Sequence, residues 1–186
     1  MKIIAVLGSP QPRGNTAGLA RAFLTAAREQ GAEVQEYLVN QMNFKGCQGC
    51  RVCKTKEDAC ILEDDLTPIL NAVKEADILV LASPVYFGDL SGQLKCFFDR
   101  TFSYLNPDFS SRLPGGKHAV LVLAQGNPDP GQFADIFPRY ERWLKLYGFE
   151  TVHLLRAVGV REPGDIAGQP DLLSQAAALA RNLAAA

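Results

Sequence analysis

Lys2-Ile-Ile-Ala-Val-Leu-Gly-Ser-Pro-Gln-Pro-Arg-Gly-Asn-Thr16 is the stretch that decides the fold of this chain. Its apolar part, Ile3 to Leu7, predicts a buried strand that ends where glycine and proline enter the sequence. Asn15 or Thr16 then caps a predicted helix that carries apolar residues on one face. A strand, a polar loop with glycines and a helix start favour an anion site, because the first amides of a helix lack internal partners and its dipole attracts negative charge.

The composition of this loop indicates one terminal phosphate bound without a metal. A Walker loop needs a lysine where Asn15 stands, and Gly8 and Gly14 lie one residue too far apart for it. The dinucleotide fingerprint G-x-G-x-x-G is also missing. A plain strand-to-helix turn with polar caps is the alternative for the loop taken alone. The candidate phosphate ligands are Ser9, Arg13, Gly14, Asn15 and Thr16.

Composition restricts the class of protein. A length of 186 residues predicts one domain that covers residues 1–186. The 19 basic and 20 acidic residues nearly balance, which argues against nucleic acid or an anionic membrane as the main partner. No apolar run approaches the length of a membrane span, and the first predicted strand begins at residue 2, so no signal peptide is expected. Four of the five cysteines fall within fourteen residues, which favours a reducing compartment, the cytoplasm.

Strand-like and helical patterns alternate along the chain. Alternation of this kind predicts a doubly wound parallel sheet of five strands in the order 2-1-3-4-5, with helices on both faces. The near-continuous apolar runs at 78–82 and 119–124 fit strands that are buried on both sides. The predicted strands are 3–8, 33–39, 77–83, 118–124 and 151–158, and the predicted helices are 16–30, 65–75, 91–105, 132–147 and 171–184.

Ligands of such a sheet bind beyond the carboxyl ends of the strands, where the strand order reverses. The loop after the third strand, Ser83-Pro-Val-Tyr-Phe-Gly88, should therefore face the phosphate loop. Its two aromatics suit a flat ring, and Gly88 allows close backbone approach, although packing of both aromatics beneath the loop is the alternative. Gln125 and Asn127, which follow the fourth strand, are further candidates for hydrogen bonds to the ligand, in a segment that is also a common turn.

A compact cysteine run follows the second predicted strand. Cys47, Cys50, Cys53 and Cys60 have the spacing C-x2-C-x2-C-x6-C, which can wrap an iron–sulfur cluster. The ferredoxin run carries proline after its last cysteine, whereas Ile61 stands there in this chain. Free or redox-active thiols and a zinc site therefore stay open beside a cluster. Placement after the second strand puts the run beside the predicted ligand site.

Together these motifs resemble the NAD(P)H-dependent FMN reductase branch of the flavodoxin-like superfamily, and more closely the iron–sulfur flavoprotein and multimeric-flavodoxin group. The resemblance spans residues 1 to about 126. The matching segments are Gly8-Ser-Pro-x-x-x-Gly-Asn-Thr16, Cys47-x-x-Cys-x-x-Cys53 with Cys60, Asp64-Asp65, Ser83-Pro-Val-Tyr-Phe-Gly88, Leu94-Lys95 and Phe98-Asp-Arg100.

The resemblance implies a flavodoxin-like fold with noncovalent FMN that is reduced by NADH or NADPH, and a homodimer or homotetramer with the flavin near a subunit interface. It implies that the phosphate lies on Ser9, Arg13, Asn15 and Thr16. It implies that the ring lies against Pro84, Val85, Tyr86, Phe87 and Gly88, and that a [4Fe–4S] cluster lies on the four cysteines. No side chain is expected to act as acid or base, because flavin N5 carries the chemistry.

Two other functional classes stay open at this point. One is an iron–sulfur flavoprotein that carries electrons without oxidising NAD(P)H directly, and the other is a non-catalytic binding protein with the flavodoxin fold. The electron acceptor, a small molecule or a protein, is not identified by the sequence. Further residues fit structural roles: Asp64 and Asp65 as caps of the second helix, and the stripe Phe133, Phe137, Tyr140, Trp143 and Tyr147 as core.

Overall fold

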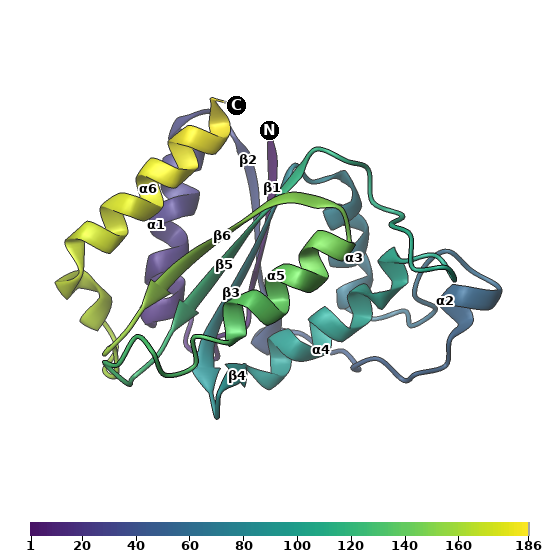
Figure 1. The fold of residues 1–186 in the computed structure, drawn as a ribbon, viewed down its shortest axis with the longest axis horizontal. Helices are drawn as coiled ribbons and strands as arrows, with labels where there is room; N and C mark the ends of the chain where they lie inside the picture. Colours follow the sequence, from purple (N-terminus) through teal and green to yellow (C-terminus); the bar gives the residue numbers. More distant parts are fainter. Residues whose placement is uncertain (186) are drawn as a thin grey trace.

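A parallel sheet of five long strands forms the centre of the computed structural model, which describes residues 1–185 (Figure 1). The strands lie in the order β2-β1-β3-β5-β6. This is the predicted relative order of the five long strands, and the parallel sheet with helices on both faces is confirmed. The strand bounds are β1 Lys2–Leu7, β2 Glu33–Leu38, β3 Ile78–Tyr86, β5 Lys117–Ala124 and β6 Phe149–Ala157.

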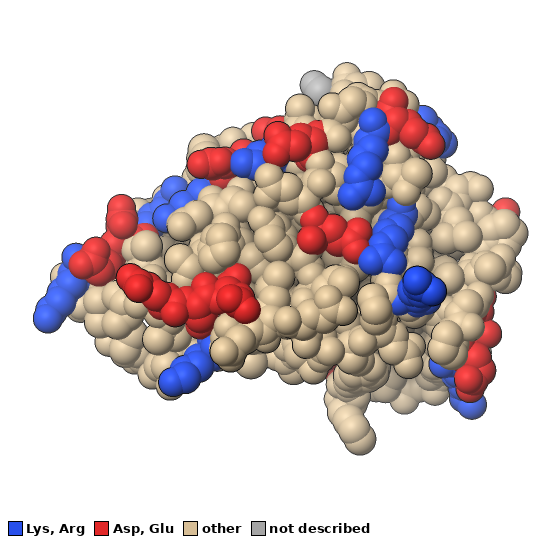
Figure 2. All heavy atoms as spheres, turned by 180° about the vertical axis from the view of Figure 1, so that it is seen from behind, with Lys and Arg blue, Asp and Glu red and all other residues tan. Residues whose placement is uncertain are grey.

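The prediction of five strands is incomplete, because a sixth, short strand forms a hairpin with β3. This strand, β4 (Asp89–Leu90), pairs antiparallel with the end of β3. Phe87 and Gly88 form the turn, both with positive φ, which is the geometry that matches the twist of two hairpin strands. The segment predicted as a loop after the third strand is therefore largely strand and hairpin. Its tip projects from the lower edge of the molecule in Figures 1 and 2.

Helices cover both faces of the sheet. One face carries α1 (Asn15–Glu29) and α6 (Pro170–Ala184), and the other carries α3 (Leu66–Glu75), α4 (Gly92–Arg100) and α5 (Ile136–Leu146) (Figure 1). Each face has its own cluster of buried apolar side chains, because strand residues alternate between the two sides. The short helices are η1 Val39–Gln41, α2 Val52–Thr55, η2 Thr101–Tyr104 and η3 Asp165–Gly168.

Helix boundaries differ from the predicted ones where local chemistry overrides periodicity. The predicted helix 132–147 begins only at Ile136, so Pro138 lies in its first turn, where a missing amide proton costs nothing. The predicted helix 91–105 is α4 followed by η2. The aromatic stripe of α5 is core at Tyr140 and Tyr147, but that prediction is wrong for Trp143, which is 46% exposed.

The surface carries both signs of charge. On the face drawn in Figure 2, lysine and arginine side chains are interspersed with aspartate and glutamate. Among residues 1–185, no helix combines the length and the apolar character that a bilayer crossing requires.

A buried arginine fastens the cysteine-bearing segment to the domain. Arg100 is 1% exposed, at the end of α4. Its guanidinium donates to the Lys45 carbonyl at 2.9 Å, to the Leu62 carbonyl at 3.0 Å and to Asp64 Oδ2 at 2.8 Å. Asp64 also accepts from the amides of Lys45 and Leu66, both at 3.1 Å. Both ends of the segment that contains the four cysteines are thus held by one side chain.

Asp64→Asn is expected to lower the free energy of unfolding by about 3 kcal/mol, because the buried Arg100 guanidinium loses its counter-charge. Asp99→Asn is the matched control, since Asp99 pairs with Lys95 where both side chains are exposed and the pair is worth about 0.5 kcal/mol. Urea unfolding followed by circular dichroism at pH 7 measures both losses. Equal losses of unfolding free energy in the two variants would contradict the role of Arg100 in holding both ends of the cysteine segment.

The Asp64–Arg100 ion pair makes the difference in unfolding free energy between wild type and Asp64→Asn depend on pH. Burial raises the pKa of the Asp64 carboxyl, but hydrogen bonds from Arg100 and from the amides of Lys45 and Leu66 outweigh burial and hold the pKa below its ordinary value. The unfolded chain therefore binds this proton more readily than the folded one. The stabilisation is complete above about pH 4 and is lost as the pH falls through the folded pKa, so the gap between wild type and Asp64→Asn should shrink in acid.

Candidate functional site

A cleft of about 290 Å³ opens at the carboxyl ends of the parallel strands. It receives residues from the loop after β1, from the end of β3, and from the loops after β5 and β6. The structure thereby brings together six of the residues proposed from sequence. The lining residues are Ser9, Gln11, Asn15, Thr16, Pro84, Val85, Tyr86, Ala124, Gly126, Val160 and Arg161.

The loop after β1 is fixed by a close approach to α4. The Gly8 amide donates to the Ala82 carbonyl at 2.8 Å, and the Ser91 hydroxyl donates to the Gly8 carbonyl at 2.8 Å. A Cβ at Gly8 would lie 2.5 Å from both Leu94 Cβ and Ser91 Oγ, so only glycine fits this contact. The loop is thus held in place by the domain before any ligand arrives.

Helix α1 begins without a side-chain cap. Its N-cap residue is Gly14, and no side chain accepts from the first-turn amides, so the prediction that Asn15 or Thr16 caps this helix is wrong. The Asn15 side chain instead donates to the Glu162 carbonyl and accepts from the amides of Gly164 and Ile166, which ties α1 to the loop before α6. Unpaired amides at the start of a helix are the groups that bind an anion.

The polar side chains around this helix start have different roles. Thr16 is 3% exposed, and its hydroxyl makes no hydrogen bond within residues 1–185. The Ser9 hydroxyl is engaged with the backbone of Gln11 in a local turn. Arg13 is exposed and lies outside the cleft lining, whereas Arg161 lines the cleft and donates to the Gly126 carbonyl at 2.9 Å.

Sequence reasoning missed Arg161. The signal was present, because Arg161 follows β6 and the carboxyl ends of all parallel strands meet at one edge of the sheet. The residues predicted to bind the flavin all lie in the loops after the first, third and fourth predicted strands. The cation in the cleft lining is therefore Arg161, from the loop after β6, and not Arg13, which was expected from the loop after β1.

The second wall of the cleft is the end of β3. Pro84, Val85 and Tyr86 line it, while Phe87 and Gly88 stand beyond it at the hairpin tip, with Phe87 fully exposed. Gln125 is buried: its amide donates to the carbonyls of Asn127 and Asp129 and its oxygen accepts from Arg156.

The Asn127 side chain accepts from the Asp129 amide within the same turn. Gln125 and Asn127 thus stabilise the turn after β5, and Gly126 lies in the cleft lining between them.

The four cysteines of the run line one small cavity of about 40 Å³, together with Arg100. The Nε of Arg100 is buried and has no hydrogen-bond partner in the described chain. Burial raises the pKa of the Cys53 thiol, although the neighbouring Lys54 opposes this. Within residues 1–185, no three histidine, cysteine or acidic side chains are grouped closely enough to hold a metal ion.

Backbone contacts hold the cysteine segment against η2. The Lys54 ammonium donates to the carbonyls of Phe102 and Leu105 and lies 4.0 Å from the centre of the Phe102 ring. Arg112 donates to the Cys53 carbonyl at 2.9 Å. The segment has little regular structure, so these cations replace the sheet and helix bonds that it lacks.

Comparison with known proteins places this geometry in a family. The family of NADPH-dependent FMN reductases matches residues 1–136. An iron–sulfur flavoprotein of Methanocaldococcus jannaschii is 45% identical over 163 residues, which are 88% of this chain and 78% of that protein. An iron–sulfur flavoprotein of Archaeoglobus fulgidus is 31% identical over 172 residues, which are 92% of this chain and 74% of that protein.

Solved structures share the fold. The NAD(P)H:quinone oxidoreductase of Methanothermobacter marburgensis superposes with a TM-score of 0.78 at 21% identity, covering 98% of this chain and 96% of that one. An FMN-dependent NADH-azoreductase of Bacillus anthracis, solved in complex with FMN, gives a TM-score of 0.76 at 14% identity, covering 99% of this chain and all of that one. With the flavodoxin-like sheet, its cleft and the sequence match in agreement, this chain belongs to the NADPH-dependent FMN reductase family of oxidoreductases.

Proposed function

We propose that this chain binds FMN in the cleft at the carboxyl ends of β1, β3 and β5, takes a hydride from NADH or NADPH, and passes the electrons to a further acceptor. The observation that carries the proposal is the uncapped start of α1 beside the unpaired Thr16 hydroxyl, at the polar end of the cleft. Donors at a helix start that no protein group accepts from are open to a ligand, and a phosphate pairs with several of them at once.

The residues of the cleft divide into two groups that suit the two ends of FMN. The amides of the first turn of α1, the Thr16 hydroxyl and the Arg161 guanidinium would hold the phosphate. The backbone and side chains of Pro84, Val85 and Tyr86 would flank the ring. When bound, FMN supplies a hydride acceptor, so the chain itself needs no acid or base and contributes position and exclusion of water.

A second candidate role concerns the four cysteines. We propose that their cavity holds a [4Fe–4S] cluster, which would accept electrons singly. Arg100, whose buried Nε has no partner in the described chain, lines this cavity, and its positive charge suits the negative charge of thiolates around a cluster. All four cysteines line the same cavity, as the four thiolate ligands of one cluster would. The relatives from Methanocaldococcus jannaschii and Archaeoglobus fulgidus, both named iron–sulfur flavoproteins, point the same way.

Thr16→Val is expected to weaken FMN binding roughly tenfold, because a hydrogen bond to a charged group contributes about 1.5 kcal/mol. Riboflavin, which lacks the phosphate, should bind both proteins equally. Thr25→Val is the matched control, since Thr25 lies on the exposed side of the same helix. Flavin fluorescence titration measures the affinities, and an unchanged FMN affinity in Thr16→Val would rule out this phosphate site.

NADH or NADPH is expected to bleach the flavin absorbance of the iron-free, FMN-loaded chain under anaerobic conditions, with one nicotinamide consumed per FMN, because each transfers two electrons. Dithionite reduction of the same sample is the control for a flavin that is able to accept electrons. Bleaching by dithionite but by neither nicotinamide would identify an electron carrier without NAD(P)H oxidation.

Anaerobically purified protein is expected to show iron, acid-labile sulfide and a broad brown absorption that dithionite bleaches. Cys50→Ser should lose these signals, because Cys50 lines the four-cysteine cavity, whereas Cys96→Ser should keep them, because the fifth cysteine does not. Iron-free protein with five titratable thiols would exclude the cluster. One equivalent of zinc in place of iron would exclude it equally.

A further inference from the structure

The hairpin of β3 and β4 forms one wall of the proposed FMN cleft, through Pro84, Val85 and Tyr86. The parallel pairing of β3 with β5 ends at Pro84, so the last two residues of β3 extend past the main sheet. They pair only with β4, where Val85 lies opposite Leu90 and Tyr86 lies opposite Asp89. A two-stranded hairpin alone is marginally stable, so the position of this wall depends on what holds the hairpin to the domain.

The turn of the hairpin does not fix its position. Phe87 has a φ of +48° and Gly88 a φ of +80°. Glycine adopts such a φ without strain, whereas a phenylalanine adopts it at a cost in free energy. The Phe87 side chain is fully exposed, so no packing of its ring offsets this cost. Contacts elsewhere must therefore hold the hairpin.

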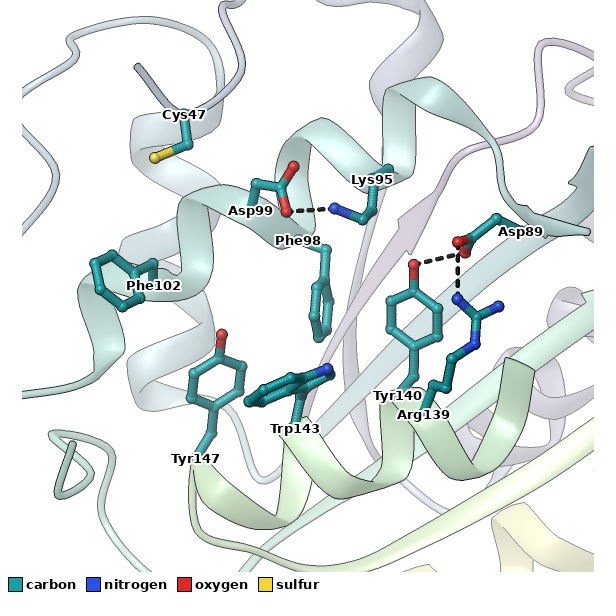
Figure 3. Close-up of a pocket in the computed structure, with 10 residues that line it drawn as sticks. All are labelled: Cys47, Asp89, Lys95, Phe98, Asp99, Phe102, Arg139, Tyr140, Trp143 and Tyr147. Atoms are coloured by element: carbon teal, nitrogen blue, oxygen red, sulfur yellow. Dashed lines mark hydrogen bonds and ion pairs between the residues drawn. The ribbon is translucent and has the colours of Figure 1, made fainter. Parts of the chain in front are cut away.

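Helix α5 supplies these contacts through two neighbouring residues. Arg139 donates to Asp89 Oδ2 at 3.1 Å and to the Gly88 carbonyl at 3.2 Å. The Tyr140 hydroxyl donates to Asp89 Oδ1 at 2.7 Å. Figure 3 shows both side chains converging on Asp89 from the same helix. Both oxygens of one carboxylate on β4 are thus held by α5.

The two partners of Asp89 differ in how firmly they are held. Tyr140 is 4% exposed, and its ring meets Phe98 of α4 edge to face, with 4.8 Å between ring centres. Arg139 is exposed and also pairs with Asp135, at 3.1 Å. An exposed ion pair stabilises little, whereas a hydrogen bond from a buried group to a carboxylate stabilises more. Tyr140 is therefore the main anchor of the hairpin.

The anchor lies outside the FMN cleft. Asp89, Arg139 and Tyr140 line a separate cavity of about 460 Å³ between α4 and α5, which Cys47 and Phe102 also line (Figure 3). This cavity and the cleft have no lining residue in common. The Asp89 carboxylate can therefore affect the cleft only through the backbone of the hairpin.

We propose that Asp89 is a positioning residue for the flavin ring: by binding Tyr140 and Arg139, it holds the hairpin where the end of β3 flanks the ring. The proposal rests on the proposed FMN site. Without the Asp89 carboxylate, the hairpin occupies the binding position for only a fraction of the time, and the apparent affinity falls by that fraction. FMN and riboflavin share the ring, so both lose affinity by the same factor.

Asp89→Ala is expected to weaken FMN and riboflavin equally, about tenfold, in fluorescence titrations of the full chain. This pattern differs from that of Thr16→Val, which is expected to affect FMN alone. Asp89→Asn keeps an oxygen that accepts from Tyr140 and should recover most of the affinity. Asp99→Ala is the matched control, because Asp99 lines the same cavity and pairs with a lysine but does not lie on the hairpin. Its affinities should equal those of wild type.

Hydrogen exchange of the flavin-free chain, followed by mass spectrometry, tests the anchor without a ligand. Amides of residues 85–90 should exchange several-fold faster in Asp89→Ala than in wild type or Asp99→Ala. Amides of β5 should exchange at the same rate in all three proteins, because the central sheet does not depend on the hairpin.

Three outcomes would overturn the proposal. Unchanged exchange at residues 85–90 would show that Asp89 does not hold the hairpin. Faster exchange with unchanged riboflavin affinity would show that the hairpin does not set the ring site. A loss of affinity for FMN alone would assign Asp89 to the phosphate end. Failure of wild type to bind either flavin would overturn the proposed FMN site and the ring role with it, while the exchange rates would still show whether Asp89 anchors the hairpin.

Discussion

The contact between Gly8 and the start of α4 is the constraint on which the functional part of this structure depends. The loop after β1 can lie against Ser91 and Leu94 only because residue 8 has no side chain. This contact orients the first turn of α1 toward the end of β3 and so defines the cleft. It also makes α4 a support of three cavities: its first residues hold the loop that lines the cleft, one side of the helix lies against α5, and Arg100 at its end lines the cysteine cavity.

Arg100 explains how an irregular segment of the chain becomes part of a folded domain. Burial of a guanidinium is costly, and here two carbonyls and one carboxylate compensate for most of it. One N–H of Arg100 remains without a partner in the described chain, and Arg100 lines the cavity of the four cysteines. The unpaired N–H of Arg100 thus belongs to a residue that lines the cavity where a charged group is proposed to bind. In native proteins, buried polar groups without a partner are expected mainly at functional sites.

The sequence predicted the parts of the structure that depend on local periodicity and on topology. The five long strands, their relative order and the meeting of the loops after β1 and β3 all follow from alternation and from the rule for parallel sheets. The sequence-based predictions failed where contacts between distant parts of the chain determine the local structure. Asn15 looks like a cap by type, yet it binds a loop almost 150 residues away. Trp143 has core periodicity, but the helix opposite leaves its side open. The β4 hairpin is too short to give a pattern.

Two residues, Cys47 and Phe102, line both the cavity of the four cysteines and the cavity between α4 and α5. A shift of either one that makes room in one cavity changes the shape of the other cavity. Thermodynamic linkage requires any such effect to be mutual: if an occupant of the first cavity alters affinity in the second, the reverse holds by the same factor. The oxidation state of the cysteine sulfurs would then affect binding between α4 and α5. Binding there would in turn affect the oxidation state of the sulfurs, and neither effect requires a domain to move.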